Sequence, residues 1–461
     1  MLVHQEDNSS SAAHRISIVM PLACLFLSII FIASCVPWQK KYDLKSKEEM
    51  TELEAIPRLL NALEDKDWFV RKEAAKALGN IGPEAEEAVP ALKLALNDRH
   101  YDVRQEAAAA LEKIGSELDP DLPVLILVAA LQSEGWSRPK EAARELGEMG
   151  PKAQKAVSAL ISVIKKDDHY MVSYQYTRIE AIRTLGKIGP AAEMAVPALI
   201  NTLSDMNFLI RQEICLALPK LGKESKAATP VLIELAEKDP NNHVRVAAAQ
   251  ALGLIGPDAK SAMPMLANVF ANEKNPFICE QAAFAMSRIE PSSKLAIDIL
   301  ARSLKDPDPR IKNYSAKALS EMGEHVTNAA PALTYTLIKD EDTVRIESAK
   351  ALGNIGPQGR YAVPALTRIL EAGNPDLRKE AVIALGKIGF PTKESTQALT
   401  RILKDPEPEL RLSAINTLIQ NNIKSPDTVA GLEKMIAEEK NREIKKAAEN
   451  AIHQLGTAPQ K

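Results

Sequence analysis

The chain has 461 residues, of which 46% are hydrophobic and 26% are charged, as is ordinary for a folded protein. Only 4% are aromatic, so the core must be built from Ala, Leu, Ile and Val. The formal net charge of −3 excludes the basic excess with which many proteins attract nucleic acid, and we expect no nucleic-acid partner.

The first 34 residues contain an apolar segment. Residues 16–35, ISIVMPLACLFLSIIFIASC, carry no charge, which is typical of a signal peptide or membrane segment. The last four of them, ending at Cys35, resemble the lipobox of bacterial lipoproteins. The resemblance implies that residues 1–34 are removed and that lipidated Cys35 anchors the chain to a bacterial membrane, on its extracytoplasmic side. Residues 35–50 would then form a polar linker.

The charges around this segment favour a second arrangement. Glu6 and Asp7 precede it, whereas four lysines follow it between residues 40 and 47. By the positive-inside rule, these lysines favour a transmembrane helix with the rest of the chain in the cytoplasm. The uncharged run over residues 16–34 is just long enough to span a bilayer. The lipobox, placed at the end of the run, makes the lipoprotein our preferred interpretation, and the other stays open.

Residues 51–456 consist of a repeated unit. RKEAAKALGNIGPEAEEAVPAL at 71–92 returns as RIESAKALGNIGPQGRYAVPAL at 345–366, with 16 of 22 letters unchanged. Self-similarity at a nearly constant period indicates a stack of repeats. Alignment gives twelve repeats, in which one position is occupied in turn by Arg71, Arg104, Pro139, Arg178, Arg211, Arg245, Cys279, Lys312, Arg345, Arg378, Arg411 and Lys445.

Each repeat is predicted to fold as two helices. In the first repeat Val70, Ala74 and Leu78 have helical spacing, with charged residues on the other side. A Gly-Pro pair then ends the helix, and it recurs at 150, 189, 256 and 356. The following Val-Pro-Ala-Leu places a proline in the first turn of the next helix. No segment of the repeats has the pattern of a strand.

The recurring Arg begins a helix, where its charge is unfavourable unless an acidic group lies nearby. An Asp stands six residues before the repeat position in six repeats. We predict a structural ladder of hydrogen-bonded ion pairs, each Asp lying near the Arg of its own or an adjacent repeat. Its members are Arg71, Arg104, Arg211, Arg245, Arg345, Arg378 and Arg411, with Asp65, Asp98, Asp205, Asp239, Asp306 and Asp405.

The succession of Asp, Val-Arg, AA-ALG-IG and Pro-Ala-Leu resembles HEAT repeats of the short type named for phycobilisome lyases. The resemblance covers residues 51–456 and leaves 457–461 as a tail. It implies an all-α fold, a right-handed superhelical α-solenoid of about twelve helical hairpins. The Thr-Pro-Leu-His of ankyrin repeats and the Trp-x-x-Leu-Gly of tetratricopeptide repeats are missing. Because sites are grafted on folds, the resemblance alone does not give a function.

Known catalytic motifs are missing from the sequence. None of the seven His residues is followed by Glu, although deoxyhypusine hydroxylase, an enzyme of HEAT-like repeats, binds iron through such pairs. We find no Gly-rich phosphate loop, Cys-x-x-Cys or Gly-x-Ser-x-Gly. We interpret Cys215 and Cys279, two repeats apart, as small buried hydrophobes that cannot bond to each other. We expect no enzyme activity, cofactor or metal, and keep a lyase-like enzyme as the alternative.

Aromatic residues gather in the first five repeats. Three residues before the repeat position stand Trp68, Tyr101, Trp136 and Phe208, and an insertion in the fourth repeat carries Tyr170, Tyr174 and Tyr176. Stacking would align these rings along one edge. Surface rings are common binding anchors, and they also pack turns against one another. The sequence therefore predicts a membrane-anchored scaffold that binds a partner protein, with this edge as the candidate binding site.

Overall fold

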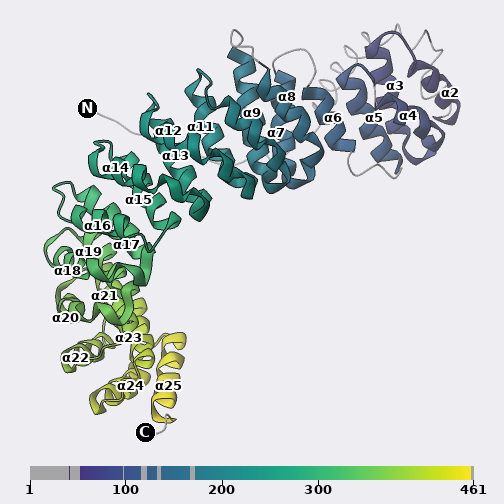
Figure 1. The fold of residues 1–461 in the computed structure, drawn as a ribbon. Coiled ribbons are helices and arrows are strands. Elements are labelled where there is room, and N and C mark those ends of the chain that lie inside the picture. Colours follow the sequence, from purple (N-terminus) through teal and green to yellow (C-terminus); the bar gives the residue numbers. More distant parts are fainter. Residues whose placement is uncertain are drawn as a thin grey trace, which may run out of the picture. The chain divides into compact units, whose positions relative to one another are not determined.

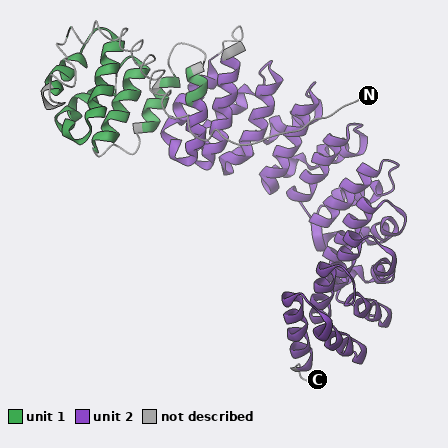
Figure 2. Cartoon of the chain, turned by 180° about the vertical axis from the view of Figure 1, so that it is seen from behind, with its two compact units in different colours: residues 1–142 green, residues 143–461 purple. Residues whose placement is uncertain are grey.

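The computed structural model describes residues 41, 52–96, 98–115, 122–131, 137–166 and 172–457. Over these residues 24 α-helices, α2 to α25, follow one another as helical hairpins, and no strand occurs among them (Figure 1). The predicted all-α solenoid fold is confirmed. The chain clusters into two compact units, residues 1–142 and 143–461, which Figure 2 colours separately.

The first compact unit begins the series of hairpins. Each hairpin has a first helix, a turn and a second helix, and the second helix carries the repeat position. The helices are α2 (Glu52–Ala62), α3 (Trp68–Ile81), α4 (Val89–Ala95), α5 (Tyr101–Ile114), α6 (Leu122–Leu131) and α7 (Ser137–Met149), and the boundary between the two compact units falls within α7.

The second compact unit continues the same alternation to the end of the described chain. Its first helices are α8 (Val157–Lys165), α10 (Val196–Thr202), α12 (Thr229–Lys238), α14 (Met263–Asn272), α16 (Lys294–Ser303), α18 (Ala330–Lys339), α20 (Val363–Ala372), α22 (Lys393–Ile402) and α24 (Pro426–Glu438). Its second helices are α9 (Val172–Ile188), α11 (Phe208–Ala217), α13 (Asn242–Ile255), α15 (Pro276–Ile289), α17 (Pro309–Met322), α19 (Asp342–Ile355), α21 (Pro375–Ile388), α23 (Pro408–Gln420) and α25 (Arg442–Thr457).

The Gly-Pro pair ends a second helix, as predicted, and opens a short 3₁₀ segment. After α13, Gly256 has φ of 73°, a value that residues with a Cβ rarely adopt. The 3₁₀ segment Gly256–Ala262 then leads directly into α14, whose first turn contains Pro264. Equivalent segments follow other second helices at Gly82–Ala88, Gly150–Ala156, Gly189–Ala195, Gly323–Ala329 and Gly356–Ala362.

Small residues let successive second helices pack closely. The Leu of the Ala-Leu-Gly motif is fully buried, as at Leu252. A Cβ added to Gly253, which follows it, would lie only 2.8 Å from the Cα of Ala285 on α15. A methyl group there would force the helices apart, so the glycine is required by packing rather than by a turn. The buried residues are mostly Ala, Leu, Ile and Val, as expected from the composition.

The N-terminal predictions lie outside the described residues. This holds for the apolar segment, for Cys35 and for all of the proposed linker except Lys41. Over the ranges that the structure does describe, no helix is both long enough and apolar enough to cross a membrane.

Candidate functional site

The predicted ladder joins a repeat to the following one at seven places among the described residues. Arg71 donates from Nε and Nη2 to the two carboxylate oxygens of Asp98, at 2.6 and 2.8 Å, while its Nη1 donates to the carbonyl oxygen of Asp65 at 2.7 Å. The ion pair therefore forms with the Asp of the following repeat, and the Asp of the same repeat contributes its backbone. Further pairs are Arg178–Asp205, Arg211–Asp239, Arg245–Glu273, Lys312–Asp340, Arg378–Asp405 and Arg411–Glu439.

Most of these acidic residues also shape the turn that carries them. Asp239 Oδ1 accepts the N–H of Asn241 at 2.8 Å, and the side chain of Asn241 accepts the N–H of His243 at 2.9 Å at the start of α13. The cap satisfies a backbone donor that the helix leaves unpaired. One carboxylate thus fixes the turn of its own repeat and holds the Arg of the preceding one, which supports the structural interpretation of these charges.

Two predicted members of the ladder do not form such a pair. Asp306 faces Cys279, which stands where a cation would be needed, and no ion pair of Asp306 is found among the described residues. Arg345 has no acidic residue in the next turn, where Ala372, Gly373 and Asn374 stand. It pairs instead with Asp342 of its own helix at 2.7 Å. The prediction was wrong for these two residues.

Arg104 also departs from the pattern. Its Nη1 donates to the carbonyl of Asp98 at 2.6 Å, but its buried Nε has no partner among the described residues. The turn that follows, residues 132–136, is outside them. Burial lowers the pKa of Arg104. At the start of the ladder, Lys41 binds the carboxylate of Asp65 in the position that a preceding repeat would fill.

In the first compact unit the predicted aromatic edge is partly used for packing. Trp68, 37% exposed, stacks on His100 with ring centroids 3.8 Å apart. The ring of Tyr101 lies beneath the guanidinium groups of Arg104 and Arg138, at 5.7 and 5.5 Å. These contacts stabilise neighbouring turns. They favour the packing interpretation for Tyr101 and leave part of Trp68 available to a partner.

In the second compact unit the predicted rings differ from one another. Tyr174 donates its hydroxyl hydrogen to the carbonyl of Val163 at 3.0 Å and lies under Lys166, so it is a packing residue. Tyr176 is 53% exposed and Phe208 is 37% exposed. Trp136 and Tyr170 lie outside the described residues. The role of the edge in binding stays a prediction.

Charged pairs cover the exposed face of the second helices in several repeats. Arg183 of α9 donates to Glu213 of α11 at 2.6 Å, and Lys350 donates to Glu347 within α19 at 2.8 Å. Lys379 of α21 pairs with Glu409 of α23. In each pair the two opposite charges neutralise each other, and the surface stays polar and solvated.

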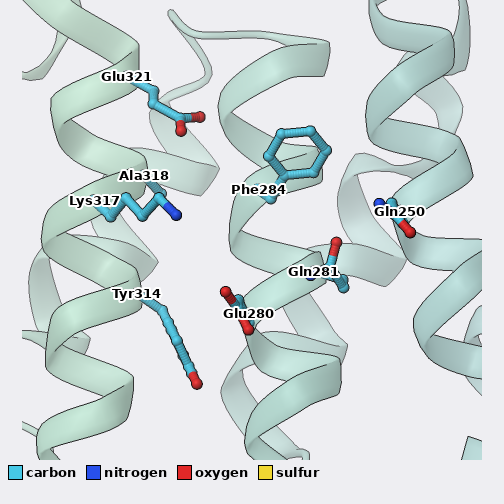
Figure 3. Close-up of a pocket in the computed structure, with 8 residues that line it drawn as sticks. All are labelled: Gln250, Glu280, Gln281, Phe284, Tyr314, Lys317, Ala318 and Glu321. Carbon is cyan, nitrogen blue, oxygen red and sulfur yellow. The ribbon is translucent and has the colours of Figure 1, made fainter. Parts of the chain in front are cut away.

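The pattern changes over α13, α15 and α17. Here a hollow of about 220 Å³ opens between second helices, with Phe284 and Tyr314 among its walls (Figure 3). The side chains of Gln250, Gln281, Glu280, Lys317 and Glu321 complete the lining. Neither Glu280 nor Lys317 forms an ion pair with any described residue. We call this hollow the α15–α17 groove and take it as the candidate functional site.

The groove is acidic at the end formed by Glu280 and Tyr314. Burial raises the pKa of Tyr314, and the nearby charge of Glu280 raises it further. At the other end, Glu321 accepts a hydrogen bond from the hydroxyl of Ser287 at 2.8 Å. Groups of three or more residues able to hold a metal ion were not found over the described ranges. The arrangement suits non-covalent recognition through rings, amides and charge.

The two repeat cysteines are buried and free, as expected for small core residues. Burial raises the pKa of Cys215 to about 12 and that of Cys279 to about 11. A thiol with so high a pKa is a poor nucleophile and a poor metal ligand at neutral pH, because the thiolate is the reactive form.

Comparison with known proteins identifies the repeats. A family model of HEAT repeats matches residues 44–112, 89–175, 173–252, 196–287, 330–400 and 363–453, well over half of the chain. The chain belongs to the HEAT-repeat family. No curated protein matches its sequence.

Solved structures of other HEAT-repeat proteins share this fold. Kap95p, in a structure with RanGDP, is 12% identical with a TM-score of 0.54, and the match covers 95% of this chain and 65% of Kap95p. Importin beta is 13% identical with a TM-score of 0.53, and the match covers 87% of this chain and 62% of that protein. The HEAT-repeat chain thus spans less than two thirds of each, and the likeness shows the fold alone.

The residues of the groove were missed from sequence. A signal existed, because the Glu that commonly stands two residues after the repeat position, as in Glu213 and Glu347, is replaced by Gln281 and Tyr314 in two successive repeats. Only the stacking of α15 on α17 brings Phe284 and Tyr314 to one place.

Proposed function

We propose that this HEAT-repeat protein is a membrane-anchored, non-enzymatic scaffold that binds a partner protein at the α15–α17 groove. The proposal rests on one difference between the second helices. Several of them cover their exposed face with ion pairs, whereas α15 and α17 present Phe284 and Tyr314 together with Glu280 and Lys317, which form no ion pair among the described residues. Half-buried rings beside unpaired charges gain from a partner that covers them.

The fold suits this role. Stacked hairpins present a long continuous surface, and repeat proteins commonly use such a surface for binding. Kap95p, which has the same type of fold, binds RanGDP. The groove is smaller than the roughly 300–1,000 Å³ of typical small-molecule sites, which favours one or two side chains of a protein partner over a whole cofactor.

The competing function is an enzyme related to the phycobilin lyases, whose repeat type the sequence resembles. We favour a scaffold because the sequence lacks catalytic motifs and because both repeat thiols are buried with raised pKa values. A pigment covalently or tightly bound to the purified protein, detected by its visible absorbance, would favour the lyase instead.

The membrane anchor is proposed from the lipobox-like end of the apolar segment. Mass spectrometry of the mature N-terminal peptide is expected to find Cys35 carrying acyl groups. Cys35→Ala should accumulate as unprocessed precursor, whereas the control Cys24→Ala should be processed normally. Two or three acyl chains anchor a protein firmly, while one holds it only weakly. An intact Met1 on membrane-bound protein would refute the lipoprotein and favour the transmembrane alternative with a cytoplasmic solenoid.

Site-specific photocrosslinking in the native cell tests the scaffold function. A crosslinking amino acid replaces Phe284 in the groove, and in a matched control it replaces Tyr335, which is 57% exposed on the first helix α18. We expect one discrete heavier species from position 284 and none from position 335. Failure to crosslink at 284, or equal crosslinking at both positions, would contradict a binding site in the groove.

A further inference from the structure

Building on the proposed function, we infer that the α15–α17 groove binds an extended segment of the partner through a lysine or arginine side chain. Glu280 receives the cation beside the ring of Tyr314, and an apolar neighbour in the segment packs on Phe284. The partner thereby supplies a cation to Glu280, which forms no ion pair among the described residues although Lys317 also lines the groove.

The missing charge is seen by comparing neighbouring repeats. Arg245 in the sixth repeat and Lys312 in the eighth each hold an acidic residue of the next turn. In the seventh repeat Cys279 stands at this position, so Asp306 has no cation among the described residues. Its charge and that of Asp308 both act on Cys279. This turn therefore has one cation fewer than the equivalent turns of the adjacent repeats, and among the described residues only Asp308 is neutralised there, by Arg310 at 2.7 Å.

Glu280 follows Cys279 directly and borders the groove. Figure 3 shows its carboxylate extending from α15 toward α17, on the side where Tyr314 lies. A carboxylate next to an aromatic face suits a cation, which gains from both the negative charge and the ring electrons.

The rest of the groove suits an extended backbone. Gln250 of α13 and Gln281 of α15 both line it, and a side-chain amide can donate to a peptide carbonyl while accepting from a peptide N–H. Phe284 offers an apolar surface between them and Glu321 (Figure 3). A single acidic subsite, one ring and two amides match a short extended peptide better than a folded surface.

Selection from a displayed library of linear peptides tests the inference. The full chain in detergent is the target, and the variants Glu280→Lys and Phe284→Ala serve for comparison. Glu380→Lys on α21 is the matched control, because it makes the same charge change on a second helix three repeats further along the chain. Enriched peptides are expected to carry Lys or Arg next to an aliphatic or aromatic residue.

Glu280→Lys should weaken these peptides by about tenfold or more, since like charges across an interface are strongly unfavourable, and should shift selection toward Asp or Glu. Glu380→Lys should leave both affinity and selected sequences unchanged. Circular dichroism must show both variants folded.

Several results would overturn the inference. Enriched peptides without basic residues, no enrichment, or basic peptides that bind Glu280→Lys equally well would each do so. So would preferential binding of a synthetic peptide of residues 39–49, because the occupant would then be the chain's own Lys-rich segment. If crosslinking at Phe284 succeeds in cells and persists in Glu280→Lys, the scaffold function stands and only the basic segment is wrong. If crosslinking fails while basic peptides are selected, the proposed function itself fails.

Discussion

Replacing Arg211 with Met removes one rung of the ladder while keeping the aliphatic part of the side chain. Arg211 donates from Nε and Nη2 to both oxygens of Asp239 at 2.8 Å, and from Nη1 to the carbonyls of Asp205 and Met206. The two side chains are only 10% and 2% exposed. Leaving the Asp239 carboxylate buried without its partner is expected to cost about 3–5 kcal/mol of the free energy of unfolding.

Arg345→Met is the matched control. Its pair with Asp342 lies within one helix, and the two side chains are 25% and 48% exposed. An exposed pair contributes about 0–1 kcal/mol, and the hydrogen bond to the Leu337 carbonyl adds about 1 kcal/mol. We therefore expect a loss no greater than about 2 kcal/mol.

Urea unfolding followed by circular dichroism gives the overall change, and hydrogen exchange of α11 and α13 shows whether it is local. Adding Asp239→Asn to Arg211→Met should recover part of the loss, because the buried carboxylate is then neutral. Equal losses for Arg211→Met and Arg345→Met would refute the reasoning.

Three further predictions concern the ladder and the two buried cysteines. Cys279→Arg should raise the free energy of unfolding by about 1–2 kcal/mol by supplying a cation to Asp306, and a lower urea midpoint would contradict this. Burial opposes ionisation of Asp98 and Glu439, but hydrogen bonds from Arg71 and Arg411 and from the backbone outweigh it and lower both pKa values. Their stabilisation is complete above the ordinary carboxyl pKa of about 4 and is lost as the pH falls further, so urea midpoints should be flat from neutral pH to about pH 5 and drop below pH 4. Iodoacetamide near neutral pH should modify Cys279 and Cys215 only after unfolding, and rapid labelling of folded protein would show that these sites open.

The repeats and the ladder could be largely predicted from the sequence because both are local and periodic. A period near 33 residues fixes which positions stack, and a buried Arg at the start of a helix demands an acidic partner. Which repeat supplies that partner depends on how successive hairpins overlap. The pairing of Arg71 with Asp98 of the next repeat therefore follows from the structure and not from the sequence. Asp306 and Arg345 were misassigned because the sequence left open whether the partner comes from the same or an adjacent repeat. Once each cation is paired with the turn of the following repeat, Cys279 stands opposite Asp306 and no acidic residue stands opposite Arg345.

The candidate site was harder to predict because it depends on side chains of three different helices. Phe284 and Tyr314 are 30 positions apart in the sequence, and each alone is an ordinary partly buried ring. The three Tyr residues close together in the insertion favoured a binding role, but the Tyr174 hydroxyl donates a hydrogen bond to the carbonyl of Val163 in its own repeat. The loss of charge pairs over α15 and α17 could not be predicted, because it requires the partner of each charge to be known.

Hydrogen exchange of the full chain with and without its crosslink-identified partner tests the central claim most directly. We expect slower exchange in the partner complex at α15 and α17, around Phe284 and Tyr314, with α3 and α5 unchanged. Slower exchange confined to α3 and α5, where Trp68 and Tyr101 lie, would place binding on the aromatic edge and contradict the assignment of the α15–α17 groove.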